Sequence, residues 1–312
     1  MNIRLLNLDD ACRQQTALLE TAAVDILDLR DWGPLVRLAC GFGTWKRFAE
    51  CLKQQLEPDA EAVPIHFLGS GDFHHVTLAL LNLLEQPFNL LILDKHPDWM
   101  RGIPFMHCGT WLHHALQLPN LMKVYHVGGD LDFDNAWRWL APWSDLRSGK
   151  IRVLPAHRIY RTGAWGSIPH HPLLHSSHNS IADSLRFNLK DEYEDLTRFP
   201  LYISLDKDLM YVRHALVNWD SGTLSLDEVK EVLAWFIQAS AGRLLGMDIV
   251  GDWSVVELHR GIRTLCHWIE HPRLNIDPLE AAQINGQTNC QLLTFVQHCL
   301  DLVPHRRERV HH

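Results

Sequence analysis

Two short segments of the sequence carry metal-binding side chains at alternating positions. The first contains Asp94, His96 and Asp98, and the second contains Asp206 and Asp208. Alternate side chains of an extended chain point to the same side, so the members of each set can face one centre. Carboxylates gathered in this way repel one another unless a cation lies between them, because burying an unpaired charge is costly. The two segments therefore predict a metal centre.

The donor types indicate which metal this centre would hold. Oxygen-rich ligation with one or two imidazoles suits Mn(II) or another divalent first-row ion, and the carboxylates are numerous enough to bridge two ions. A Gly-rich turn that ends in His74 and His75 offers further imidazoles, whereas Asp72 in that turn is expected to cap the following helix. An isolated Asp-x-Asp is more often a turn or a helix cap, but two clusters beside such a turn favour metal binding.

Short apolar runs precede both segments and predict the strands that position them. Asp94 ends the run 88–94, and Asp206 ends the run 200–206. Further runs of this kind span 63–68, 122–127, 151–154 and 243–250. Near-continuous apolar character is typical of parallel strands buried on both faces, and such sheets bind ligands beyond the carboxyl ends of their strands. We therefore expect an α/β fold with the site at that edge.

Amphipathic stretches between these runs predict the covering helices. They span 73–86, 109–117, 225–239 and 279–300, and the clearest begins with a capping box formed by Ser225 and Glu228. No internal repeat or low-complexity linker marks a domain boundary, so we expect a single domain over 1–312. The segment at about 161–195 is rich in His, Ser and Pro, and we expect it to form a long loop excursion.

Composition excludes several classes of protein. The 312 residues are 46% hydrophobic and 21% charged, which is typical of globular proteins, and the net charge of -8 leaves no basic surplus for nucleic acid. No apolar run approaches the roughly 18 residues of a membrane span, and the first residues lack a secretory pattern. The seven cysteines form no Cys-x-x-Cys pair, which argues against a structural zinc site or a disulfide framework. We expect a cytoplasmic protein without nucleic-acid or membrane partners.

At this point the residues resemble the ureohydrolase family, the arginases and agmatinases of the arginase/deacetylase superfamily. Asp94-x-His96-x-Asp98 matches the family's Asp-Ala-His-x-Asp motif, and Ser204-x-Asp206-x-Asp208 matches its Ser-x-Asp-x-Asp motif, in the same order and at a similar separation. Similar but less specific segments are the turn Gly71-Asp72-Phe73-His74, the segment His107-Cys108-Gly109 and the strand Gly246-Met247-Asp248-Ile249-Val250.

The resemblance implies a three-layer α/β/α fold with a central, mostly parallel sheet and two Mn(II) ions. It implies a bridging hydroxide that attacks a guanidinium or amidine carbon, with His107 moving protons. By position, one ion would be held by His74, Asp94, Asp98 and Asp206. The other would be held by Asp94, His96, Asp206 and Asp208, so that Asp94 and Asp206 bridge. Zn2+ or another divalent ion is the alternative metal, and a homo-oligomer is compatible with the family.

The chain departs from the family pattern around the predicted substrate. Phe73 falls where the family has its histidine, which leaves His74 or His75 as the ligand. The position of the family's guanidinium-binding Glu is Gly251, so we expect the adjacent Asp252 to contact the substrate instead, with Asp220 as a second candidate.

The sequence thus predicts a binuclear hydrolase of a non-peptide C–N bond, with a small guanidino or amidino compound as substrate. One alternative is a deacetylase-like amidohydrolase with a single zinc ion, but retention of both Asp98 and Asp208 favours two metals. The other is a non-catalytic metal-binding or regulatory protein, which the missing Glu supports.

Overall fold

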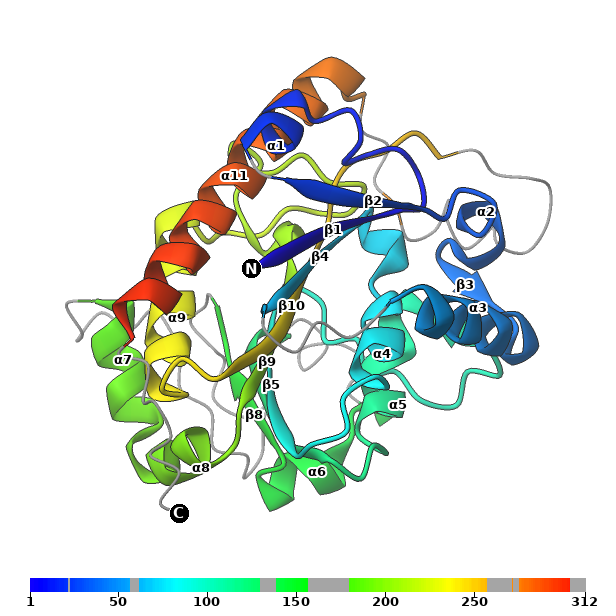
Figure 1. Ribbon diagram of the computed structural model, residues 1–312. Helices are drawn as coiled ribbons and strands as arrows, with labels where there is room; N and C mark the ends of the chain where they lie inside the picture. Colours follow the sequence, from blue (N-terminus) through cyan, green and yellow to red (C-terminus); the bar gives the residue numbers. More distant parts are fainter. Residues whose placement is uncertain are drawn as a thin grey trace, which may run out of the picture.

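The computed structural model describes residues 1–21, 23–56, 62–129, 139–156, 180–256, 271 and 275–303. Its centre is an eight-stranded sheet in the order β2-β1-β4-β10-β9-β5-β7-β8, in which every pair of neighbours is parallel (Figure 1). The strands are β1 (Asn2–Asn7), β2 (Val24–Asp28), β4 (Pro64–Gly69), β5 (Phe88–Asp94), β7 (Leu121–Gly128), β8 (Ile151–Leu154), β9 (Leu201–Asp206) and β10 (Leu244–Val250). The predicted parallel sheet is confirmed.

One face of the sheet packs against a helical layer that includes the first and the last of the described helices. The helices of this layer are α1 (Thr16–Thr21), α7 (Ile181–Asn188), α8 (Tyr193–Arg198), α9 (Leu226–Ala239) and α11 (Pro278–Leu302). Ser225 caps α9, and its capping box with Glu228 is formed as expected. Apolar side chains of alternate strand residues, such as Leu91, Leu93 and Leu205, fill the space beneath these helices.

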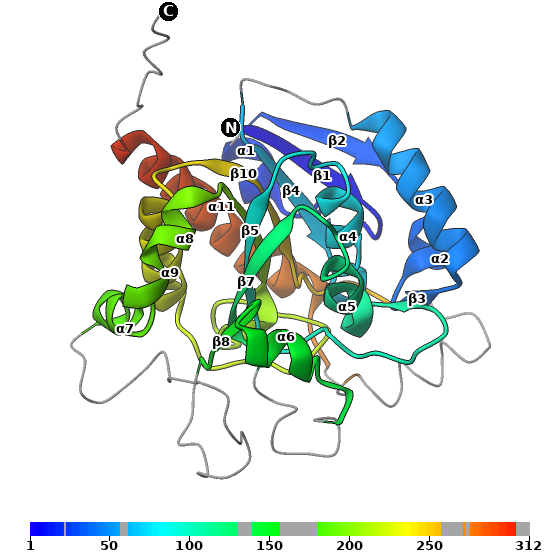
Figure 2. The same cartoon turned by 90° about the horizontal axis from the view of Figure 1, so that it is seen from below.

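The other face is covered by the helices that lie between the first strands and the middle of the chain (Figure 2). They are α2 (Gly33–Val36), α3 (Phe42–Gln55), α4 (Val76–Leu81), α5 (Trp111–Ala115) and α6 (Trp143–Ser148). A small antiparallel pair, β3 (Ala39–Cys40) with β6 (Met106–His107), lies beside this layer. Two helical layers around one sheet make the three-layer α/β/α fold that the sequence predicted.

The segment expected to leave the sheet is only partly described. Residues 161–179 lie outside the described residues, whereas residues 181–188 and 193–198 form α7 and α8 rather than loop. Ser180 caps α7 by accepting a hydrogen bond from the Asp183 backbone. Sequence reasoning overlooked this helix start because it read the whole segment as loop. Among the described residues, no helix combines the length and the apolar character needed to cross a bilayer.

Candidate metal centre

The predicted ligands meet at the carboxyl ends of two neighbouring strands. β5 ends at Asp94 and β9 ends at Asp206, and the two strands pair in parallel, so both carboxylates lie at the same edge of the sheet. Asp208 follows in a short 3₁₀ helix, η6 (Lys207–Leu209), where its backbone N–H donates to Asp206 Oδ1 at 2.9 Å. These carboxylates are buried, as the sequence pattern required.

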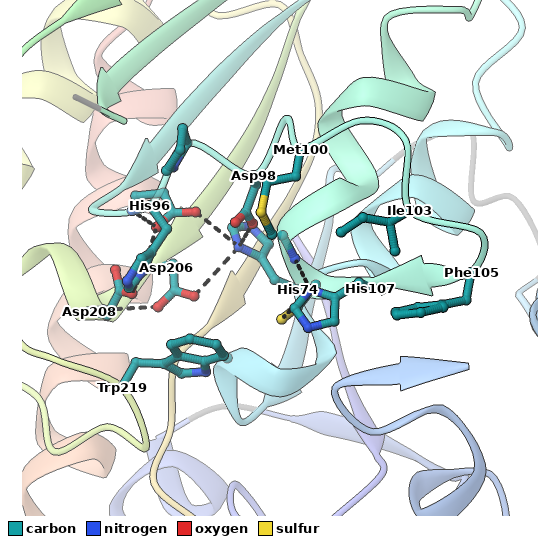
Figure 3. Close-up of a pocket in the computed structure, with 15 residues that line it drawn as sticks. His74, His96, Asp98, Met100, Ile103, Phe105, His107, Asp206, Asp208 and Trp219 are labelled. Carbon is teal, nitrogen blue, oxygen red and sulfur yellow. Dashed lines mark hydrogen bonds and ion pairs between the residues drawn. The ribbon is translucent and has the colours of Figure 1, made fainter. Parts of the chain in front are cut away.

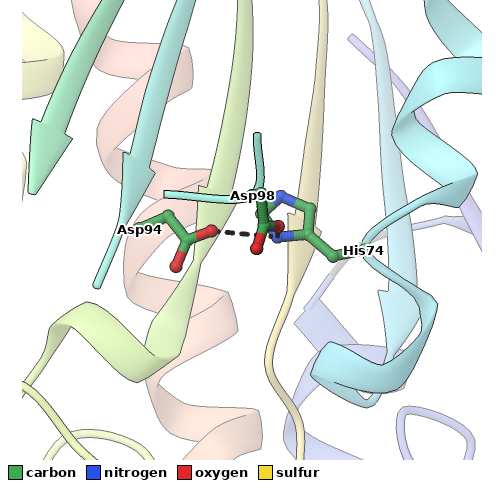
Figure 4. Close-up of side chains that lie close together, drawn as sticks. All are labelled: His74, Asp94 and Asp98. Carbon is green, nitrogen blue, oxygen red and sulfur yellow. Dashed lines mark ion pairs between the residues drawn. The ribbon is translucent and has the colours of Figure 1, made fainter. Parts of the chain in front are cut away.

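A first group of possible metal ligands joins His74 to Asp94 and Asp98 (Figure 4). His74 Nδ1 lies 3.2 Å from Asp94 Oδ2, 3.0 Å from Asp98 Oδ2 and 3.5 Å from Asp206 Oδ2. Asp98 adopts a left-handed backbone conformation with φ of 51°, and the Trp111 indole N–H donates to its Oδ2 at 2.7 Å. A strained, tightly held carboxylate of this kind is typical of functional sites.

A second group joins Asp94 to His96 and Asp208. His96 Nδ1 lies 2.6 Å from Asp208 Oδ2 and 3.8 Å from Asp94 Oδ1. The two groups therefore share Asp94, with one of its oxygens facing each group. Asp206 lies between them, because its Oδ2 faces His74 and the Asp208 backbone binds its Oδ1. All six residues expected to hold metal are thus brought together.

The two consecutive histidines point to different surroundings. A 3₁₀ helix, η1 (Gly71–Phe73), precedes them and accommodates the extra residue in the turn. His74 faces the carboxylates, whereas His75 packs against the Trp45 ring with 5.3 Å between ring centroids. Burial, together with the nearby imidazoles, lowers the pKa of His75 to about 3. The geometry therefore favours His74 over His75 as the ligand.

A hydrogen-bonded chain behind His74 fixes the orientation of its ring. His74 Nε2 lies 3.0 Å from Ser204 Oγ, and the Ser204 hydroxyl donates to Asp248 Oδ1 at 2.8 Å. The Thr77 hydroxyl donates to the same oxygen at 3.0 Å. Because Nε2 is held in this way, Nδ1 is the nitrogen presented to the carboxylates.

Burial and the neighbouring charges shift the pKa values of several groups in the centre. Burial and the neighbouring Asp98 and Asp208 raise the pKa of Asp94 well above its usual range, and burial with Asp208 raises that of Asp206 to about 7. Although burial opposes it, the contact with Asp208 raises the pKa of His96 to about 10. Asp94 Oδ2, which is buried, accepts no hydrogen bond from the described residues. Divalent cations would satisfy these atoms without protons, so the donor set fits them.

A cavity of about 270 Å³ opens directly onto these ligands (Figure 3). His107 lines it, and the Gly109 backbone N–H donates to its Nδ1 at 2.9 Å. The wall away from the carboxylates is mainly apolar. Its described members are Pro97, Met100, Ile103, Phe105, Cys108 and Trp219.

Sequence reasoning missed Trp219, which forms one side of the cavity. Its ring lies 5.3 Å from that of His96, and its indole N–H donates to Asp72 Oδ1 at 3.2 Å. Asp72 also accepts hydrogen bonds from Arg37 Nε at 2.7 Å and contacts His271 Nε2 at 2.7 Å. Asp72 does not cap the following helix as expected: it lies within η1, which Ser70 caps, and α4 has no side-chain cap.

The structure does not bring Asp252 into the cavity. Its carboxylate is buried on the opposite side of η6, where it accepts hydrogen bonds from Lys207 Nζ and Gln15 Nε2, both at 2.6 Å. Gly251 has φ of 87°, and a side chain there would collide with the Asp206 carboxylate, so neither position supplies the expected substrate contact. Asp220 is exposed and does not line the cavity either.

We compared the chain with known protein families, curated proteins and solved structures. No protein-family model matches the chain. A curated protein of Thermotoga maritima, described only as uncharacterized, is 28% identical over 188 residues, which span 60% of this chain and 58% of the relative's own length. The solved structure of formimidoylglutamase from Bacillus subtilis aligns with a TM-score of 0.57 at 12% identity, covering 97% of this chain and 87% of that one.

Arginase from Bacillus subtilis aligns with a TM-score of 0.51 at 13% identity, covering 95% of this chain and 98% of that one. The chain has the arginase fold. The resemblance expected from the two Asp-rich motifs is therefore confirmed for the fold. Within the arginase fold, the chain places its clustered carboxylates at the carboxyl edge of the sheet.

Proposed function

We propose that the chain is a hydrolase that uses two divalent metal ions, Mn2+ foremost, to cleave a non-peptide C–N bond in a small guanidino or amidino compound. The observation that carries this proposal is the pair of ligand groups that share Asp94 and open onto one cavity. The fold of formimidoylglutamase and arginase, two proteins named for such reactions, supports it.

The ligands divide between the two ions as the contacts suggest. His74 and Asp98 would hold one ion and His96 and Asp208 the other, and Asp94 and Asp206 would contribute to holding both. When bound, the two ions would lower the pKa of a shared water and orient it toward the substrate carbon.

The chain's own residues would complete the reaction. Because His107 Nδ1 accepts the Gly109 N–H, the neutral ring carries its proton on Nε2. His107 would direct this N–H toward the departing nitrogen of the substrate as a hydrogen-bond donor. The proton that this nitrogen takes up would come from the attacking water, so the His107 ring would stay neutral. Trp219 and Phe105 would cover the bound substrate and exclude bulk water, which strengthens the electrostatic interactions within the site.

The residues of the cavity wall limit which substituent the guanidino or amidino group of the substrate can carry. Among the described lining residues none is Lys, Arg or Glu, so the wall offers no partner for the charged amino-acid end of arginine. Leaving such a group unpaired in a buried site weakens binding strongly. We therefore propose that the preferred compound has a small uncharged substituent.

Steady-state kinetics with the Mn2+-loaded protein tests the proposal. Cleavage of a panel of guanidino and amidino compounds should be detected as release of urea, ammonia or amide, and L-arginine should be a poor substrate. Asp94→Asn should abolish turnover, whereas Asp220→Asn, which changes an exposed carboxylate outside the cavity, should not. A folded protein that binds metal but cleaves no member of the panel would instead support a non-catalytic role, which the glycine at 251 favours.

A further inference from the structure

A second cavity lies at the opposite edge of the sheet from the metal centre. Its volume is about 730 Å³, and it is bounded by the first residues of β1, β4, β9 and β10 together with the ends of α3 and α4. The beginnings of β1, β4 and β10 lie side by side in the sheet (Figure 1). Strands rise about 3.3 Å per residue, so six-residue strands separate the two cavities by roughly 15–20 Å.

Besides Tyr202, this cavity has a second buried polar side chain, His66. It lies on β4, is only 4% exposed and lines the cavity, yet neither ring nitrogen has a hydrogen-bond partner among the described residues. Leaving a buried polar group of this kind unpaired is costly. Because the ring faces a cavity rather than a packed core, an occupant of the cavity is the natural partner.

The charges around this cavity favour an anion. Arg4 lies next to His66 on the neighbouring strand, and Lys53 lies at the rim, whereas Glu85 is the single carboxylate among the described lining residues. Arg4 pairs at 3.5 Å with Asp25, which is itself 69% exposed, so solvent screens that pair. Lys53 has no ion-pair partner among the described residues. Among the described lining residues, the two cationic side chains Arg4 and Lys53 therefore outnumber the one carboxylate, and they lie close to an imidazole that can donate a hydrogen bond.

Aliphatic side chains form much of the remaining wall and suit a hydrocarbon chain, beside the amides of Asn2, Asn82 and Gln86. The aliphatic part is formed by Leu56, Val63, Leu80, Leu83, Leu84, Leu244 and Leu245. The ring of Tyr202 lies against Gly246, where an added Cβ would be 3.0 Å from Tyr202 Cε2, so the missing side chain leaves room for this ring at the cavity floor. Burial of each CH2 group of an aliphatic chain against this wall would favour binding.

We propose that this cavity binds an aliphatic monocarboxylate, with the carboxylate against His66 and Arg4 and the chain along the leucine wall. The site is separate from the metal centre and shares no lining residue with it. Its existence does not depend on the proposed hydrolase activity.

Isothermal titration of the full-length, metal-loaded protein with octanoate tests this site. We expect saturable binding of one octanoate with a Kd below about 1 mM, which corresponds to a binding free energy of about -4 kcal/mol. Octylammonium, which has the opposite charge, should bind at least tenfold more weakly. Acetate, which offers the metal centre the same carboxylate without the chain, should not bind at this concentration.

Variants of the cavity distinguish it from adventitious binding. His66→Phe and Lys53→Glu should each weaken octanoate binding at least fivefold, whereas Lys46→Glu, the same charge reversal at an exposed position of α3 outside the cavity, should leave it unchanged. Lys53 is exposed, so its variant should fold even if the buried substitution prevents folding. Absence of saturable octanoate binding, equal binding of octylammonium, or native affinity in the folded Lys53→Glu variant would each overturn the proposal.

Discussion

Asp94 is the residue on which the proposed centre depends most, because both ligand groups include it. Its two oxygens face different imidazoles, and its burial makes an uncompensated charge costly. A bound cation relieves that cost, so metal binding and folding should be linked at this residue.

Asp94→Asn tests this link. The substitution keeps the shape of the side chain and removes the charge that both ions would share, so we expect Mn2+ affinity to fall at least tenfold, or about 1.4 kcal/mol. The rise in melting temperature that Mn2+ produces should shrink accordingly. Calorimetric titration and thermal unfolding measure both effects, with Asp220→Asn as the control. Native affinity in Asp94→Asn would mean that this residue is not a ligand.

The neighbouring histidines give a matched pair of variants. His74→Ala should remove one of two bound ions, because it deletes the only imidazole of the first ligand group. His75→Ala should leave the metal content unchanged but destabilise the protein by roughly 2–4 kcal/mol, since it leaves a cavity beside Trp45. Metal content and urea unfolding measured on both variants separate the two roles. A loss of metal confined to His75→Ala would reverse the assignment.

At the scale of the elements, a ring of buried polar side chains contacts η6 on the side away from the cavity. Lys207 lies between two candidate ligands in the sequence, and its Nζ donates to Asp252 at 2.6 Å and to Asn289 on α11 at 3.0 Å. Gln15 closes the ring by donating to Asp252 and accepting from Asn289 Nδ2 at 2.7 Å. This ring ties the loop after β9 to the chain's first and last described helices.

Lys207→Met should therefore be strongly destabilising. It leaves the Asp252 carboxylate buried without its cation, which typically costs about 3–5 kcal/mol. Adding Asp252→Asn should recover part of that loss, because the double variant buries no unpaired charge. Urea unfolding of both single variants and of the double variant gives the coupling energy. Strictly additive losses would show that the two charges do not stabilise one another.

The sequence predicted the strands well where both of their faces are buried, and poorly where polar residues interrupt the apolar pattern. The apolar runs at 88–94 and 200–206 became β5 and β9 within one residue, because strands buried on both faces must be continuously apolar. β1 and β2 were missed, since Arg4 and Asp25 interrupt their apolar patterns near the edge of the sheet.

The candidate metal ligands could be predicted from the sequence, but the residues around the substrate could not. Five of the six candidate ligands follow from strand ends and alternation, and His74 followed from the turn that resembles the family's. The contact expected from Asp252 was wrong in position because the positive φ of Gly251 directs the chain behind Asp206. Trp219 comes from a separate loop, and only the tertiary structure shows that it packs against His96.

At the scale of the whole molecule, three buried neutral histidines link stability to pH. Burial lowers the pKa of His66 and His75 to about 3 and that of His126 to about 4. The unfolded chain, in which histidine titrates near 6.5, therefore binds more protons than the folded chain between these values. These groups make stability fall as the pH drops from about 6.5 toward 4.

His126→Leu should reduce this dependence. Between pH 6.5 and pH 4, His126 lowers the free energy of unfolding of the native protein by about 3 kcal/mol. This follows because its pKa is about 4 in the folded chain and about 6.5 in the unfolded chain, and each pKa unit corresponds to about 1.4 kcal/mol. The difference between native and variant unfolding free energies should accordingly change with pH in that window and be constant above pH 7. Urea unfolding at several pH values measures it. A difference that does not vary with pH would show that His126 is not buried in its neutral form.

The central claim is that this arrangement of carboxylates and imidazoles holds two metal ions. The most direct test is the metal content of the full chain, purified without chelators and equilibrated with Mn2+, measured by elemental analysis together with a calorimetric titration of the metal-free protein. The account predicts two equivalents of Mn2+ per chain in the native protein and one in His74→Ala. A folded native protein that binds less than one equivalent of any divalent ion would contradict it.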